Sequence, residues 1–330
     1  MSRLPEPADA LATRRYRRVV SVPAIATACA ITVALTGCGS GGGDTTTPST
    51  SAAGCASEST AGRDDVEPIP IAPAKITITH QGAESRSVLA ATPQRGTAQL
   101  TTLSVTSTAV SRTAKDGVDN RRQTVSIPIT ARWGCRDSTD LELALARPIS
   151  PDPTLDAQLA KSDGGRAGLA IGPGTIPISL RLLPTDASGP EARHAIEQSL
   201  VQALQVSVGL PTQPVGVGAE WTSQRSISGA VTVTQTMHVT LKSWAGKRVV
   251  LGVEFEETPI NSVFAVPGTS ETVTLRRYSN EGTGTVTLDL DRALPTDATI
   301  TLSGARELVG SDASAPIVQQ TGATVSWRAR

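Results

Sequence analysis

The feature that most limits the fold of this chain is the alternation of apolar and polar residues with a period of two. Residues 230–242 alternate over most of their length, and residues 249–255 follow after a turn, which predicts a long antiparallel hairpin. Residues 75–80 and 124–130 alternate in the same way, and residues 98–105 do so less cleanly. An alternating strand buries one face, so these segments predict a curved antiparallel sheet with one face in a core.

The composition agrees with a β-rich α+β fold. The chain has only two Phe, two Tyr and four Trp, so its core must consist mainly of Val, Leu, Ile and Ala. Val and Thr are β-branched and favour pleated surfaces over helices.

Two segments of the chain resemble each other. Residues 172–187 and 282–298 each contain Gly-x-Gly-Thr, an alternating stretch and the sequence Leu-Pro-Thr-Asp-Ala. We interpret each as a turn, a strand and the segment that leaves the strand. We therefore predict two related β units, at about 67–187 and 210–330. The alternative is a chance similarity between two strands that end in proline.

One amphipathic helix is predicted between these halves, at about residues 190–206, where it would cover the sheet. Ser188 followed by Glu191 forms a capping-box pattern, with proline in the first turn. A short second helix is expected at 156–161. The apolar residues of the longer helix fall on one face at helical spacing: Ala192, Ile196, Leu200, Ala203 and Leu204.

The first 37 residues have the pattern of an export signal. Four arginines lie within residues 14–18, and residues 19–37 carry no charge and include a short apolar run. A permanent membrane helix is the alternative, but the apolar stretch is short and contains Pro23. We therefore predict a signal peptide at 1–37.

The end of this segment resembles the lipobox of bacterial lipoproteins. Leu35 and Thr36 precede Gly37-Cys38, and the resemblance implies cleavage between Gly37 and Cys38 and attachment of lipid to the Cys38 sulfur. Two or three acyl chains hold a protein on a bilayer where one does not. The expected location is the extracytoplasmic face of the cell membrane, with the membrane as partner through the lipid anchor.

After the anchor, residues 38–66 are predicted to form a flexible stalk that is rich in Gly, Ser and Thr, and residues 67–330 a β-rich globular domain. With Cys29 in the segment that is expected to be removed and Cys38 carrying lipid as the resemblance implies, Cys55 and Cys135 remain. Outside the cytoplasm an isolated pair is most simply a disulfide. The alternative is two free or separately paired thiols.

The segment after the helix carries a family resemblance. Residues 210–221 have the pattern LP-x-x-PVG-x-GA-x-W and precede the long hairpin. This pattern resembles an uncharacterised family of bacterial envelope lipoproteins that is defined by a domain of unknown function. The resemblance covers roughly residues 70–328 and implies no activity and no catalytic residues.

No motif in the sequence indicates catalysis, so we predict a protein that is not an enzyme and has no cofactor. There is no G-x-S-x-G elbow and no phosphate loop. No metal site is expected, because the chain lacks a C-x-x-C motif and its three histidines lie far apart in the sequence. With 30 basic and 30 acidic residues the chain has no electrostatic signature of nucleic-acid binding.

Three functional hypotheses follow. The first is a module that binds a lipid or other apolar ligand between a curved sheet and its helix. The second is a structural or interaction module whose partner is an envelope protein. The third is an enzyme of unfamiliar design, which would need His80, His194 or His238 beside carboxylates in a cleft. A cavity in the core favours the first, and a closed core favours the second.

Overall fold

In a computed structural model of the chain, the described residues are 54–92, 94–113, 117–228, 231–265, 272–310 and 314–330. All of them belong to one compact unit, Thr50–Arg330. The predicted signal peptide, Gly37 and Cys38 lie outside the described residues. In the described part of the chain, neither helix is long and apolar enough to cross a bilayer.

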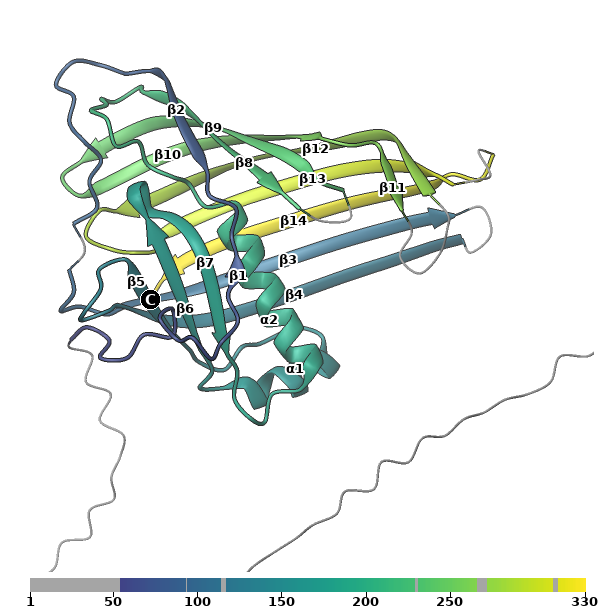
Figure 1. The fold of residues 1–330 in the computed structure, drawn as a ribbon, viewed down its shortest axis with the longest axis horizontal. Coiled ribbons are helices and arrows are strands. Elements are labelled where there is room, and N and C mark those ends of the chain that lie inside the picture. Colours follow the sequence, from purple (N-terminus) through teal and green to yellow (C-terminus); the bar gives the residue numbers. More distant parts are fainter. Residues whose placement is uncertain (1–53, 93, 114–116, 229–230, 266–271, 311–313) are drawn as a thin grey trace, which may run out of the picture. The chain divides into compact units, whose positions relative to one another are not determined.

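The unit is built on one large antiparallel sheet, as expected from the alternating segments (Figure 1). The spatial order is β1-β7-β6-β5-β4-β3-β14-β13-β12-β10-β9-β8-β2, and β11 pairs with β12. In chain order the strands are β1 (Ile69–Pro70), β2 (Lys75–His80), β3 (Gln99–Thr113), β4 (Gly117–Trp133), β5 (Asp140–Leu145), β6 (Arg166–Gly172), β7 (Ile176–Leu183), β8 (Glu220–Ile227), β9 (Val233–Ala245), β10 (Arg248–Pro259), β11 (Val263–Ala265), β12 (Thr272–Asp289), β13 (Asp297–Val309) and β14 (Ile317–Ala329).

The predicted hairpin is present as β9 and β10, but its turn is tighter than expected. Trp244 pairs with Val249 and Ala245 with Arg248, so only two residues remain in the turn. Gly246 has a φ of 60°, a left-handed conformation that glycine adopts without steric cost. The strands therefore continue through most of the segment that the sequence assigned to the turn.

The two edges of the sheet are joined by one continuous segment, residues 69–80, which we call the edge strap. β1 pairs with β7 at one edge, β2 pairs with β8 at the other, and only residues 71–74 separate β1 from β2. The step from Pro70 to Lys75 can span at most about 18 Å. The two edges must therefore lie close together at this end, which requires the sheet to curve.

The predicted covering helix is confirmed as α2 (Pro190–Gln205), which lies on the inner face of the curved sheet (Figure 1). The predicted cap is wrong. Gly189 is the N-cap, without a side-chain hydrogen bond, because the Ser188 hydroxyl instead donates to Ser162 Oγ at 3.0 Å. The short second helix, α1 (Pro153–Leu159), starts earlier than expected because Asp152 caps it. The 3₁₀ turns η1 (Ala160–Ser162) and η2 (Pro173–Thr175) complete the helical elements of the described residues.

The C-terminal end of α2 is held by a buried arginine from the sheet. Arg225 on β8 donates to the carbonyl oxygens of Leu204 at 3.1 Å and Ser207 at 2.9 Å. Burial disfavours the charged guanidinium and lowers the pKa of Arg225 to about 10. A cation at this end also interacts favourably with the helix dipole.

Aliphatic side chains dominate the core, as the composition requires. The core lies between the inner face of the sheet and α2. Trp221 is a large buried side chain of this core, and its indole N–H donates to the Gly209 carbonyl at 3.1 Å. The largest fully buried side chains are Trp221, Leu103, Ile127, Ile129, Leu141, Leu159, Leu180, Leu200, Leu210, Met237, Leu241 and Leu251.

The repeated Gly-x-Gly-Thr segments adopt different conformations. Gly174 lies in the turn η2 with a φ of 70°, as the sequence suggests. Gly282 and Gly284, in contrast, lie inside the long strand β12 and pair with β13, so the second copy is not a turn. The origin of the sheet from two related β units stays a prediction.

Candidate ligand site

Residues 54–66, which the sequence assigned to the stalk, belong to the folded unit. Ala56 forms a bridge with Gly134, and Thr60 and Ala61 are buried. Cys55 and Cys135 form a disulfide with a Cα–Cα distance of 5.0 Å, which is the pairing expected from the cysteine count. The predicted boundary at residue 67 is therefore wrong. This segment has no apolar periodicity and is held by polar contacts. We call it the N-terminal clamp.

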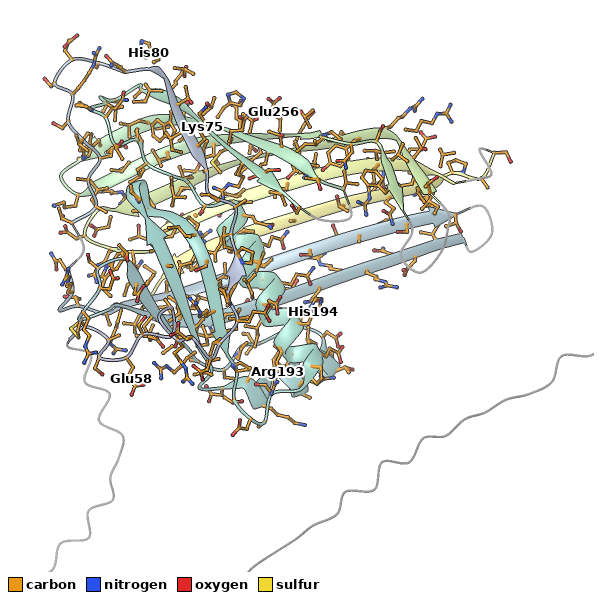
Figure 2. The ribbon with its side chains drawn as sticks, in the orientation of Figure 1. Glu58, Lys75, His80, Arg193, His194 and Glu256 are labelled. Atoms are coloured by element: carbon orange, nitrogen blue, oxygen red, sulfur yellow. A yellow bond between two sulfur atoms is a disulfide. The ribbon has the colours of Figure 1, made fainter. Side chains whose placement is uncertain are left out.

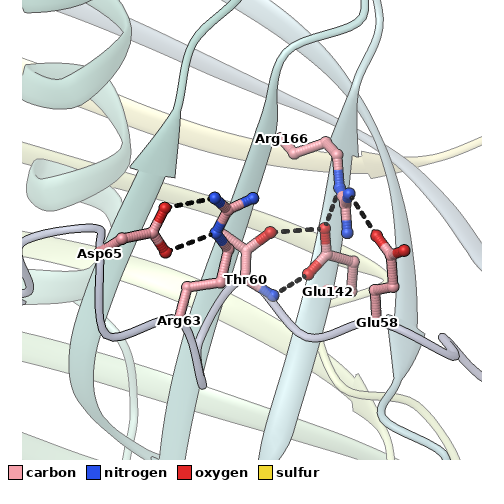
Figure 3. A network of polar contacts seen from close by, with 6 residues as sticks. All are labelled: Glu58, Thr60, Arg63, Asp65, Glu142 and Arg166. Atoms are coloured by element: carbon pink, nitrogen blue, oxygen red, sulfur yellow. Dashed lines mark hydrogen bonds and ion pairs between the residues drawn. The ribbon is translucent and has the colours of Figure 1, made fainter. Parts of the chain in front are cut away.

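Glu142 on β5 is the centre of the polar contacts of the clamp (Figure 3). This carboxylate is 8% exposed and accepts hydrogen bonds from the Thr60 backbone N–H at 2.7 Å and the Thr60 hydroxyl at 2.9 Å. It also accepts from Arg166 Nε at 2.6 Å, and Arg166 reaches Glu58 at 3.1 Å. Burial opposes the charge of Arg166, but the two glutamates outweigh it, and the pKa of Arg166 is raised.

A second arginine fixes the other end of the clamp. Arg181 on β7 donates to the carbonyl oxygen of Val66 at 2.9 Å and to that of Ala61. Gly168 on β6 pairs with Arg181, and the clamp backbone passes directly over it. These contacts place Val66, the last residue of the clamp, and the residues that follow it up to Pro70 along the side of a pocket.

Because the clamp lies so close to Gly168, a single methyl group there should destabilise the fold. A Cβ at this position would lie 1.9 Å from Ala61 N and 2.4 Å from Thr60 C. We expect Gly168→Ala to lower the free energy of unfolding by about 1–3 kcal/mol in urea denaturation. Gly96 is exposed, and a Cβ there would meet nothing within 4 Å. Gly96→Ala should therefore change the free energy of unfolding by less than about 0.5 kcal/mol. Equal effects of both substitutions would contradict the close approach.

The pocket beside the clamp has a volume of about 500 Å³. Its walls come from the clamp and edge strap, from the ends of β5, β6 and β7, and from the N-terminal half of α2. The apolar lining includes Val66, Pro68, Ile69, Pro70, Leu145, Leu182, Leu183, Pro184 and Ile196. We call it the strap pocket.

Charged side chains of both signs also line the strap pocket. Arg166 and Arg193 contribute positive charge, and Glu67 and Glu197 contribute negative charge. Arg193 projects from α2 (Figure 2) and makes one long hydrogen bond, to the Thr185 carbonyl at 3.4 Å. An apolar interior with a few polar groups is the usual character of a small-molecule site.

The space between α2 and the sheet is, in contrast, nearly filled. The void there has a volume of about 60 Å³ and is lined mainly by apolar side chains of β6, the α2 C-terminus, β12 and β13, including Leu169, Ala203 and Ile300. That is far below the roughly 300–1,000 Å³ of typical ligand pockets. The sequence hypothesis placed the ligand under the helix, whereas the larger pocket lies beside it.

The three histidines occupy separate elements. His80 on β2 and His194 on α2 lie well apart (Figure 2), and His238 on β9 faces Glu256 at 3.6 Å. Within the described ranges, no group of three or more His, Cys, Asp or Glu side chains is arranged to hold a metal ion.

Sequence reasoning identified no residue of the strap pocket as a site. The lining residues come from segments far apart in the chain and share no motif, and most of them are ordinary strand and helix residues. The expected Cys55–Cys135 pair was the one available signal that the chain near residue 55 is held against the fold. The sequence matches no protein-family model and no curated protein.

Proposed function

We propose that this protein is a lipid-anchored lipoprotein of the extracytoplasmic membrane face that binds a lipid or other apolar ligand without catalysing a reaction. The observation that carries the binding proposal is the strap pocket, with its volume of about 500 Å³ and its apolar walls. The anchor rests on the sequence alone, on Cys38 after a signal-like segment and on the resemblance to envelope lipoproteins.

The chemistry of the pocket favours an amphiphilic ligand over a fully polar one. Burying an alkyl chain against Ile69, Leu182 and Leu183 would contribute about 25 cal/mol per Å² of apolar surface removed from water. The charged residues that also line the pocket, Arg166, Arg193, Glu67 and Glu197, offer partners to a polar headgroup. The edge strap pairs with both edges of the sheet and also supplies part of the pocket wall. The shape of the pocket therefore depends on how the strap joins the two edges.

A charge placed in the apolar wall of the pocket should weaken this binding. We expect Leu183→Arg to weaken binding of a dansyl-labelled fatty acid at least about tenfold, because the guanidinium would lie where the alkyl chain binds. Binding is measured by fluorescence titration of the full chain carrying Cys38→Ala, which removes the anchor. Ile178→Arg is the matched control, because Ile178 lies on the same strand, is 47% exposed and does not line the pocket.

The outcome also separates the two leading hypotheses. If Leu183→Arg and Ile178→Arg bind the probe equally well, or if neither the parent chain nor the controls bind it, apolar ligand binding in the strap pocket is wrong. The nearly filled core under α2 would then favour the alternative, a non-catalytic structural or interaction module. That alternative predicts that cross-linking at the cell surface captures one envelope protein.

A further inference from the structure

A second groove lies on another side of α2 and is chemically different from the strap pocket. Its volume is about 560 Å³, and it is lined by α2 and by β3, β4, β12, β13 and β14. These strands continue well beyond α2 (Figure 1), so the groove opens onto the uncovered part of the inner face. We call it the carboxamide groove, after the side chains that line it.

Five carboxamides line this groove. Gln198, Gln202 and Gln205 project from α2, and Gln123 and Asn280 face them from β4 and β12. Each carboxamide both donates and accepts hydrogen bonds, as a sugar hydroxyl does. In the case of Gln202, the side-chain oxygen accepts from Ser107 Oγ at 3.0 Å, which fixes the side chain and leaves its NH₂ group for a ligand.

The charge of the groove excludes strongly ionic ligands. Among the described lining residues there is no acidic side chain, and Arg121 is the one charged group. Arg121 Nε is paired with Asp119 at 2.9 Å. A cation would therefore find no counter-charge in the groove, and a polyanion would find one cation that is already paired.

Small and apolar residues lie between the carboxamides. Ala109 and Ala323 are on neighbouring strands at the base of the groove, and Val201 and Leu302 add apolar surface. A pyranose ring presents C–H groups on its faces and hydroxyls around its rim. An apolar base bordered by carboxamides is complementary to both.

The topology argues against an extended peptide as the ligand. Peptides that add to a sheet need a strand edge with free N–H and C=O groups. The strands at the base of the groove, β3, β14 and β13, are each paired on both sides. A peptide lying across them would have to satisfy its own backbone from side chains alone, whereas an oligosaccharide needs only side-chain partners.

We propose that the carboxamide groove binds a neutral oligosaccharide, in a site independent of the strap pocket. Calorimetric titration of the full chain carrying Cys38→Ala with maltohexaose, cellohexaose, xylohexaose and chitohexaose tests this. At least one of the four should bind, and the double substitution Gln198→Ala/Gln205→Ala should weaken it at least about tenfold, the effect of losing one or two hydrogen bonds.

The control is Gln224→Ala, which removes an exposed carboxamide on β8, outside the groove, and should leave the affinity unchanged. Equal thermal unfolding of all three proteins establishes that the fold is intact. The proposal is wrong if none of the four oligosaccharides binds, or if the double substitution leaves the affinity as it was. Because Leu183 does not line this groove, Leu183→Arg should bind the oligosaccharide normally, which separates failure of this site from failure of the strap pocket.

Discussion

Replacing Cys38 with alanine is expected to abolish lipid attachment and to leave the protein soluble or unprocessed. The anchor that we propose from the resemblance to a lipobox has its acyl chains on the Cys38 sulfur. Each buried CH₂ group contributes about 0.8 kcal/mol to membrane binding. Without the thiol no lipid can be attached.

The measurement is cell fractionation followed by intact-mass analysis. The parent protein should begin at Cys38 with the mass of its acyl chains added, and the Cys38→Ala protein should appear soluble or unprocessed, without them. Cys29→Ala is the matched control, because Cys29 lies in the segment expected to be removed, and it should partition as the parent does. If Cys38→Ala is still cleaved and remains with the membrane, the predicted location is wrong.

Local patterns predicted part of the regular elements of the fold, but they gave no segment for β5, β6, β8, β13 or β14. The alternation at 75–80 corresponds to β2, and the helical spacing of apolar residues corresponds to α2, because in both cases one face packs on the core. Conformations that depend on neighbouring segments were not predictable in this way. The Gly-x-Gly-Thr sequence forms a turn before β7 but lies inside the strand β12, where β13 pairs with the second copy.

The edge strap and the N-terminal clamp show why the candidate site was not predicted. The pairing of β1 with β7 and of β2 with β8 joins residues more than a hundred positions apart. The clamp has no apolar periodicity that would predict a folded segment. Glu142, Arg166 and Arg181 hold it through its backbone and polar groups. A pocket whose wall follows from these contacts cannot be read from the sequence of any one segment.

The disulfide at the start of the clamp should contribute strongly to stability. It joins residues 80 positions apart, and a cross-link over a loop of this length restricts the unfolded chain. Disulfides typically contribute about 2–4 kcal/mol. We therefore expect the double substitution Cys55→Ser/Cys135→Ser to lower the free energy of unfolding by about 2–4 kcal/mol in urea denaturation under oxidising conditions.

Its effect should be largest locally, because the disulfide ties the clamp to the end of β4. In the double variant, backbone amides of residues 56–66 should exchange with solvent faster, while those of α2 change little at low denaturant. The parent protein treated with a reducing agent should behave as the variant does, and the variant itself should not respond to that agent. If the parent and the variant unfold at the same urea concentration, the polar contacts of Glu142 and Arg181 suffice to hold the clamp. The disulfide would then add nothing to the stability of the fold.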